Sequence, residues 1–175
     1  MLSVRVDRVA GQDRGRIGEL YLRHADAASR LAYLLTGDRA LAEDITQDAF
    51  VKLTGRLAHL RDPGAFDAYL RRTVVNLSRS HFRRRRVERS YLVRARNAPA
   101  ALGAPADAAL DDRDLVWHAL QALSERQRTA IVLRFYEDLP EARVADILGC
   151  RPGTVKSLVS RGLDAMREQI GGDAR

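Results

Sequence analysis

The sequence predicts an all-α protein made of two small helical domains joined by a flexible linker. Apolar residues recur at helical spacing in both halves of the 175-residue chain, and no alternating strand pattern appears. Between the halves lies NAPAALGAPADAA, a stretch rich in alanine and proline that cannot build a core. Hydrophobic residues make up 46% of the chain, an ordinary globular value, so we expect both halves to fold.

The first domain is predicted over residues 14–87 and contains three helices. The first helix ends at Gly37, and Asp38 can cap the second helix. The second helix ends before a tight loop at residues 61–64, which contains both proline and glycine. The third helix follows this loop and runs out into four consecutive arginines.

The linker is predicted at residues 88–110 and the second domain at residues 111–171. Ser124 and Gln127 have the spacing of a capping box at the start of a helix that ends near Tyr136. Two further helices are expected after it.

These last two helices form a predicted helix-turn-helix from about Pro140 to Glu168. Gly149 permits the left-handed backbone of a sharp turn, and Pro152 suits the first turn of the helix that follows. The apolar stripe of that second helix consists of Val155, Val159, Leu163 and Met166. The side left free to enter a DNA groove carries Thr154, Ser157, Leu158 and Arg161. The cations able to reach phosphates are Arg151 and Lys156.

The formal charge of +7 and the isoelectric point near 10.3 favour an acidic partner, with nucleic acid as the leading class. The first domain nevertheless carries an acidic face, because Asp44, Gln47 and Asp48 share one side of a helix, opposite its apolar stripe. Charged faces are usually just solvated. On a basic DNA-binding protein, however, an acidic face repels DNA and so suits a protein partner.

The third helix interleaves aromatic residues with arginines. Aromatic rings stack on unpaired bases while guanidinium groups hold the backbone, so this composition suits capture of a melted DNA strand. Phe66, Tyr69 and Phe82 at helical spacing fit a hydrophobic core equally well, and the pattern alone leaves both interpretations open. The arginine run at residues 83–86 either grips phosphates or is a solvated helix end.

Neither catalytic nor metal-binding chemistry is predicted. The four histidines are scattered without metal-ligand spacing, no phosphate loop or nucleophile motif occurs, and the single cysteine, Cys150, excludes an internal disulfide. We therefore expect a protein that is not an enzyme and needs no cofactor. The first residues carry charges where a signal peptide needs an apolar stretch, and no segment approaches a membrane-spanning run, so we expect a cytoplasmic protein without membrane insertion.

Two segments carry a family resemblance. ALSERQRTAIVLRFYEDL followed by VADILGCRPGTVKSLVSRGLDAM resembles domain four of extracytoplasmic-function sigma factors, which reads the upstream, minus-thirty-five promoter element. LTGDRALAEDITQDAFVKL resembles the sigma segment that docks on the clamp helices of the polymerase β′ subunit. The resemblance implies a sigma factor with domains two and four of that family. Its partners would be promoter DNA and core RNA polymerase, through the β′ clamp helices and the β subunit.

The resemblance also implies roles for individual residues. Those matching the polymerase-docking pattern are Asp44, Gln47 and Asp48. Those expected to recognise and open the minus-ten element, or to hold the DNA beside it, are Arg61, Asp62, Phe66, Tyr69, Arg71, Arg72, Asn76, Arg79, Arg83 and Arg84. Those expected to contact the minus-thirty-five element are Arg151, Thr154, Lys156, Ser157, Leu158, Ser160 and Arg161.

Two residues depart from the family pattern. Leu158 stands where many relatives have arginine, which removes a guanine contact and offers a group for a thymine methyl instead. Tyr69 replaces a frequent tryptophan and can still stack on a base.

Two other function classes are alternatives to a sigma factor. A dimeric regulator that binds operator DNA would use the same helix-turn-helix, but it needs neither an acidic docking face nor an aromatic and basic helix. A nuclease would need a metal or nucleophile site, which the sequence lacks. An anti-sigma protein that holds the factor inactive is common in the family, and the sequence leaves its presence open.

Overall fold

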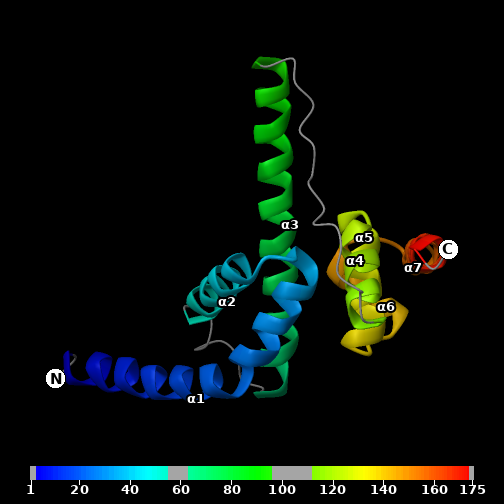
Figure 1. The fold of residues 1–175 in the computed structure, drawn as a ribbon. Helices are drawn as coiled ribbons and strands as arrows, with labels where there is room; N and C mark the ends of the chain where they lie inside the picture. Colours follow the sequence, from blue (N-terminus) through cyan, green and yellow to red (C-terminus); the bar gives the residue numbers. More distant parts are fainter. Residues whose placement is uncertain (1–2, 55–62, 96–111, 174–175) are drawn as a thin grey trace. The chain divides into compact units, whose positions relative to one another are not determined.

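The structure is a computed structural model that describes residues 3–54, 63–95 and 112–173, with side chains described within 17–54, 65–88 and 113–172. Every regular element in these ranges is a helix, so the predicted all-α class is confirmed for them (Figure 1). The chain divides into two units, Met1–Ser78 and Arg79–Arg175. Each unit is described by itself.

The first unit is built from α1 (Ser3–Thr36), α2 (Arg39–Thr54) and the beginning of α3 (Pro63–Ala95). Helices α1 and α2 pack against each other through alanines and larger apolar residues. The buried apolar residues of this unit are Ala28, Leu31, Ala32, Leu35, Ala42, Ile45, Ala49, Phe50, Leu53, Phe66, Leu70, Val74 and Val75.

The turn between α1 and α2 is the one that the sequence predicts. Gly37 has a φ of 73°, in the left-handed region that glycine adopts without a steric penalty, and its N–H donates to the Tyr33 carbonyl at 2.8 Å. The Asp38 carboxylate accepts from the Leu41 N–H at 3.1 Å and so caps α2.

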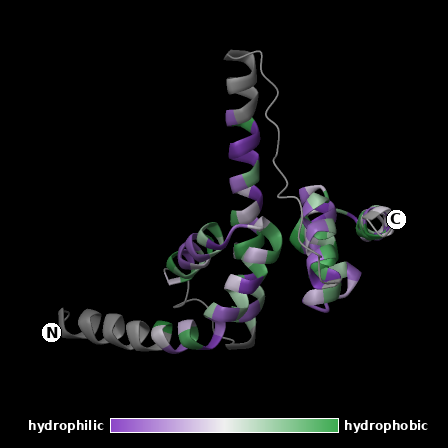
Figure 2. Ribbon diagram, in the orientation of Figure 1, coloured by the Kyte–Doolittle hydropathy of each residue, from purple (hydrophilic) through white to green (hydrophobic). Residues whose placement is uncertain are grey.

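Helix α3 is longer than expected. It continues through Ala95, past residue 88, where the linker is predicted to start. Arginine is a good helix former, and the first proline after Pro63 is Pro99, so nothing in the arginine-rich segment breaks the helix. Figure 2 shows strongly hydrophilic residues along this part of α3. The rest of the predicted linker, residues 96–110, lies outside the described residues.

The second unit contains α4 (Asp112–Ala122), α5 (Glu125–Ile131), a π-helical turn η2 (Val132–Tyr136), α6 (Glu141–Leu148) and α7 (Pro152–Asp173). Helix α7 packs against α4, α5 and α6. The buried apolar residues of this unit are Ala119, Leu120, Leu123, Ala130, Ile131, Val132, Leu133, Val144, Ala145, Leu148 and Val155.

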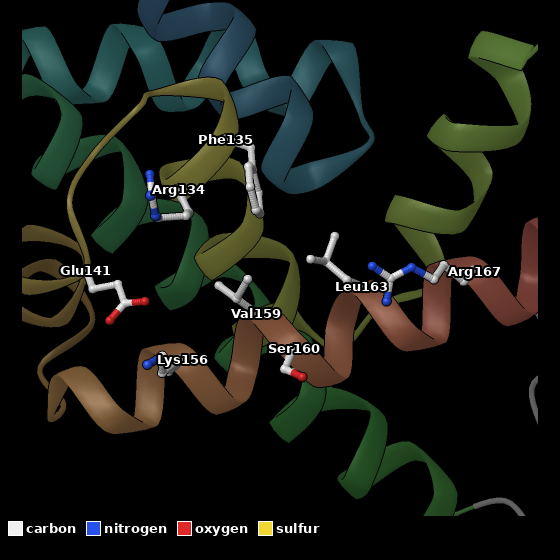
Figure 3. Close-up of a pocket in the computed structure, with 8 residues that line it drawn as sticks. All are labelled: Arg134, Phe135, Glu141, Lys156, Val159, Ser160, Leu163 and Arg167. Carbon is white, nitrogen blue, oxygen red and sulfur yellow. The ribbon is translucent and has the colours of Figure 1, made fainter.

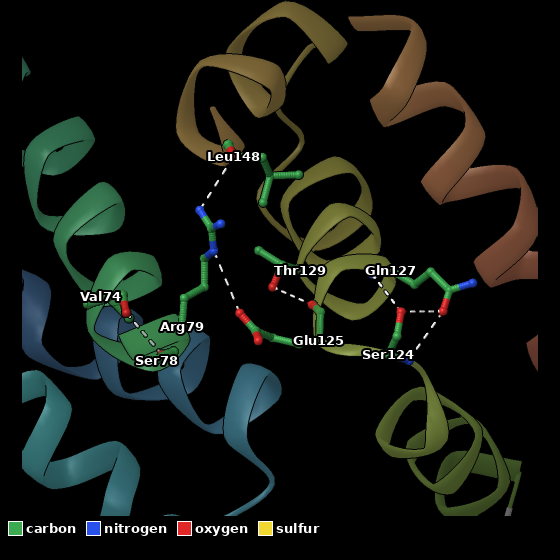
Figure 4. A network of polar contacts seen from close by, with 8 residues as sticks. All are labelled: Val74, Ser78, Arg79, Ser124, Glu125, Gln127, Thr129 and Leu148. Carbon is green, nitrogen blue, oxygen red and sulfur yellow. Dashed lines mark hydrogen bonds and ion pairs between the residues drawn. The ribbon is translucent and has the colours of Figure 1, made fainter. Parts of the chain in front are cut away.

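The predicted capping box at the start of α5 is confirmed. The Gln127 N–H donates to the Ser124 hydroxyl at 3.4 Å, and the Ser124 N–H donates to the Gln127 side-chain oxygen at 3.2 Å (Figure 4). The predicted helix-turn-helix is also present as α6, a turn and α7. Gly149 ends α6 with a φ of 64°, and the Cys150 N–H donates to the Ala145 carbonyl at 3.0 Å.

Arg128 of α5 is a buried cation that closes the end of α4. Its guanidinium donates to the Gln121 side chain at 2.8 Å, to the Gln121 carbonyl, and to the Leu123 carbonyl at 3.2 Å. Burial lowers the pKa of Arg128, and the charge of Glu125 acts in the opposite direction. The side chain therefore satisfies carbonyls that the end of a helix leaves without partners.

Replacing Arg128 with alanine is expected to lower the free energy of unfolding by about 1.5–3 kcal/mol, because the carbonyls of Gln121 and Leu123 lose their charged donor. Urea unfolding followed by the fluorescence of Trp117, the single tryptophan of the chain, measures this loss. Arg126→Ala removes an exposed arginine from the same helix and should change stability by less than about 0.5 kcal/mol. Equal losses for the two variants would contradict the role given to Arg128.

Candidate nucleic-acid interface

The predicted docking residues lie together on the outer side of α2. Asp44, Gln47 and Asp48 are all exposed, whereas Ile45 and Ala49 between them are buried. The spacing of three and four residues places the three exposed side chains on one face, so the structure brings them together. This face is called the α2 acidic face below.

The predicted minus-ten residues are divided by α3 between the core and the surface. Phe66 is 2% exposed and contacts His24 and Phe50, with ring centroids 5.3 and 6.0 Å away. This burial corrects the expectation that Phe66 stacks on a base. Tyr69, three residues further on, is 47% exposed and offers its ring to solvent.

Arg71 is engaged within α3. Its guanidinium donates to the Asp67 carboxylate at 2.7 Å, and the other oxygen of that carboxylate lies 3.7 Å from His24 Nδ1. Arg71 thus belongs to a polar cluster that joins α1 to α3, which makes it less available to DNA than the exposed Arg72.

The remaining minus-ten candidates form one stripe along α3. Tyr69, Arg72, Asn76, Arg79 and Arg83 follow one another at intervals of three or four residues, so they share one side of the helix. Arg79 is partly buried and the others are exposed. At 1.5 Å per residue the stripe is about 21 Å long. It is called the α3 stripe below.

Two members of the minus-ten set stand apart from the stripe. Arg84 is exposed on the neighbouring side of α3. Arg61 and Asp62 lie outside the described residues.

The predicted minus-thirty-five residues occupy two sides of α7. Thr154, Ser157 and Arg161 are exposed away from the buried Val155. The Ser157 hydroxyl donates to the Gly153 carbonyl at 3.0 Å, and Arg161 Nε donates to the Ser157 carbonyl at 3.1 Å. The groups left to contact a base are the hydroxyl lone pairs and the terminal guanidinium nitrogens.

Lys156 and Ser160 lie on another flank of α7, beside a pocket. Both line a pocket of about 370 Å³ whose other walls come from η2, α6 and the later part of α7 (Figure 3). Arg134 and the 59%-exposed Phe135 form the η2 wall. The sequence did not indicate this pocket, because a helical pattern does not show which flank of α7 another element covers.

The last two residues of the set lie at the edges of the reading surface. Leu158 is half-buried, so only part of its side chain can meet a thymine methyl. Arg151 is exposed in the turn before α7.

Sequence reasoning missed Arg143, an exposed cation on α6 whose guanidinium nitrogen lies 4.0 Å from a carboxylate oxygen of Asp146. The first helix of a helix-turn-helix crosses the DNA backbone. A basic residue on that helix is the sequence signal that could have identified Arg143.

Within the described residues, no cluster of histidine, cysteine, aspartate or glutamate could hold a metal ion. None of the helices described is long and apolar enough to cross a membrane.

Comparison with known proteins assigns both units. The model of sigma-70 region 2 matches residues 20–88, and the model of sigma-70 region 4 matches residues 113–166. The RNA polymerase sigma-E factor of Streptomyces coelicolor is 35% identical over 87% of this chain and 85% of its own length. The ECF RNA polymerase sigma factor SigW of Bacillus subtilis is 25% identical over 97% of both chains.

Solved structures agree with this assignment. The sigma factor RpoE of Bartonella quintana, solved in complex with the anti-sigma factor NepR, has a TM-score of 0.65 and 25% identity over 88% of this chain and 96% of its own. CnrH, solved with the cytosolic domain of CnrY, shares the fold with a TM-score of 0.64 and 24% identity over 95% of both chains.

Two helical units with a DNA-reading helix-turn-helix in the second define a promoter-recognition protein. The chain belongs to the sigma-70 family, in its extracytoplasmic-function group, and is an RNA polymerase sigma factor. A dimeric operator-binding regulator is not favoured, because both units match sigma-70 regions, the first unit included.

The different positions of Phe66 and Tyr69 give a direct test of the site. Phe66→Ala removes a core ring and should lower the free energy of unfolding by about 3–5 kcal/mol. Tyr69→Ala removes a surface ring and should change it by less than about 0.5 kcal/mol. Urea unfolding followed by far-ultraviolet circular dichroism compares the two. A large loss for Tyr69→Ala would place that ring in the core and remove it from the DNA surface.

Proposed function

We propose that this sigma factor divides its work between three surfaces: the α2 acidic face binds core polymerase, the α3 stripe captures the opened minus-ten strand, and α7 reads the minus-thirty-five element. The observation that carries the proposal is the separation of charge. A chain of net charge +7 keeps an exposed acidic face on α2 and gathers exposed arginines on α3. Opposite charges on separate helices suit two partners of opposite charge.

Core polymerase is the partner proposed for the α2 acidic face. Within the described part of the chain, Asp44 and Asp48 form no ion pair, so their charges remain available to a basic surface. Val51, one helical turn further on, is 71% exposed and extends the face with an apolar group. Complementary charge would steer encounter, and the apolar contact would slow dissociation.

The variant Asp44→Ala/Asp48→Ala should weaken binding to core polymerase by about tenfold, the value of two exposed charge contacts. Fluorescence anisotropy of the labelled full chain titrated with core polymerase measures this change. Asp26→Ala is the matched control, because it removes an exposed carboxylate from α1 of the same unit. If Asp44→Ala/Asp48→Ala binds core polymerase as tightly as Asp26→Ala and the wild type do, the α2 acidic face is not the docking surface.

The α3 stripe is proposed to hold the melted strand. The exposed Tyr69 ring offers a face on which an unpaired base can stack, and Arg72, Asn76 and Arg83 lie on the same side to hold the phosphate backbone or donate to a base. Binding free energy drives the opening, since stacking stabilises bases only after they leave the duplex. The exposed arginines beyond Arg83 would grip duplex DNA at the edge of the bubble and make binding strongly salt-dependent.

Tyr69→Ala should lower the yield of open complex on duplex promoter DNA by about 5- to 150-fold, the range expected for loss of one stacked base. Tyr69→Phe keeps the ring and should remain near the wild type. Permanganate reactivity of unpaired thymines in the holoenzyme complex reports the opening. A promoter with a preformed bubble removes the cost of unpairing and should restore much of the signal to Tyr69→Ala. If Tyr69→Ala opens duplex DNA normally, Tyr69 has no part in melting.

Helix α7 is proposed to read the upstream element through Thr154, Ser157 and Arg161. Arg151 would contact the phosphate backbone beside them, and the exposed part of Leu158 would contact a thymine methyl. Lys156 and Ser160 lie beside the pocket on the other flank of α7 and would contribute to the backbone contacts at that edge.

The remaining parts of the proposal concern setting and control. The polymerase would supply all catalysis, and the factor would act in the cytoplasm, where polymerase and promoter DNA meet. An anti-sigma protein that covers the α2 acidic face or α7 would compete with polymerase or promoter. The similar sigma factor RpoE of Bartonella quintana has been solved in complex with the anti-sigma factor NepR.

A further inference from the structure

The crossing of α7 over α5 contains a position with no room for a side chain. Gly162 of α7 is buried, and a Cβ built there would lie 2.7 Å from Ile131 Cδ1 and 3.4 Å from Gln127 Cβ. Carbon atoms in contact are normally about 3.5–4.0 Å apart. The first contact is therefore a clash, and the second is tight.

The residues that face Gly162 have little freedom to move. Gln127 is held by the capping box with Ser124 at the start of α5. Ile131 is 7% exposed, and its β-branched side chain has one strongly preferred χ1 rotamer in a helix, so its Cδ1 atom can move only by rotation about χ2. Its neighbours Val132 and Leu133 are buried as well. A larger residue at 162 would thus change the separation of α7 and α5.

A shift of α7 would reach the DNA-reading side chains. The helix is also held at Val155, which is fully buried near its first turn. If α7 is displaced at Gly162 while Val155 stays in place, the helix tilts. Arg161 is next to Gly162 in the chain and would move with it. Hydrogen bonds to bases tolerate only a few tenths of an ångström, and the phosphate contact proposed for Arg151 in the turn would fix the register at the same time.

We propose that Gly162 and Ile131 form a matched pair that sets the separation and tilt of α7 on α5, which makes Gly162 a positioning residue for recognition of the upstream element. Gly162 touches no DNA in this proposal and acts only through Thr154, Ser157 and Arg161. The inference rests on the proposed reading role of α7. It adds that the distance between two helices controls the specificity of that surface.

The test uses the full chain bound to core polymerase. Duplex DNA with an intact minus-ten element and a randomised upstream element is first enriched on the wild-type holoenzyme. The affinities of the variants are then measured for the enriched DNA and for the same DNA with a scrambled upstream element. Failure of the wild type to enrich any upstream sequence would remove the proposed function of α7 itself, which separates that failure from failure of the pair.

Gly162→Ala should weaken binding to the enriched DNA by about tenfold, comparable to loss of one base contact, and leave binding to the scrambled DNA unchanged. Gly171→Ala is the control, because it is the same substitution on α7 with no atom within 4 Å of the new Cβ. Normal binding of the enriched DNA by Gly162→Ala would overturn the proposal.

Ile131→Val supplies the compensating change, since it removes the Cδ1 atom that meets the new Cβ. The double variant Gly162→Ala/Ile131→Val should bind the enriched DNA as tightly as Ile131→Val alone. Trp117 fluorescence reports whether Gly162→Ala by itself unfolds the second unit. If it does, the double variant provides the test, because it must fold and bind the enriched DNA. Absence of this rescue would overturn the pairing, because loss of Cδ1 removes the contact through which the added Cβ is proposed to act.

Discussion

Close approach between helices at small residues is the constraint on which both units depend. Ala32 and Ala49 are fully buried in the first unit, and Ala130 and Gly162 are buried in the second. A small side chain at a crossing lets two backbones come near, so that larger apolar residues on either side interlock. A helix as short as α6 (Glu141–Leu148) is not stable by itself and buries few apolar groups. Close packing against its neighbours, rather than helix propensity, must therefore hold it in place.

The functional surfaces follow from this packing. Helix α2 turns Ile45 and Ala49 to the core, which leaves Asp44 and Asp48 in solvent. Helix α3 likewise gives its apolar side to the core of the first unit and leaves Arg72 and Arg83 in solvent. The sigma factor thus obtains an acidic and a basic surface from one folding requirement, because residues that cannot enter a core gather on the opposite helix faces.

The sequence predicted elements and faces well where local chemistry decides them. Two further features have non-local or cooperative causes. Helix α3 continues past the predicted linker start at residue 88, because arginine is a good helix former and the helix meets no proline before Ala95. Lys156 and Ser160, which are predicted to contact DNA, also line a pocket with η2, which α7 meets only in the folded unit.

What the sequence by itself determined are the turns, caps and helix faces. Gly37 and Gly149 both adopt positive φ, and Ser124 caps α5, because these features depend on residues within one helical turn. Only the tertiary structure decided that Phe66 is core while Tyr69, one turn away, is surface. It alone also decided how closely α5 and α7 approach at Gly162. Both outcomes depend on atoms from segments distant in the chain, which periodicity along one helix does not record.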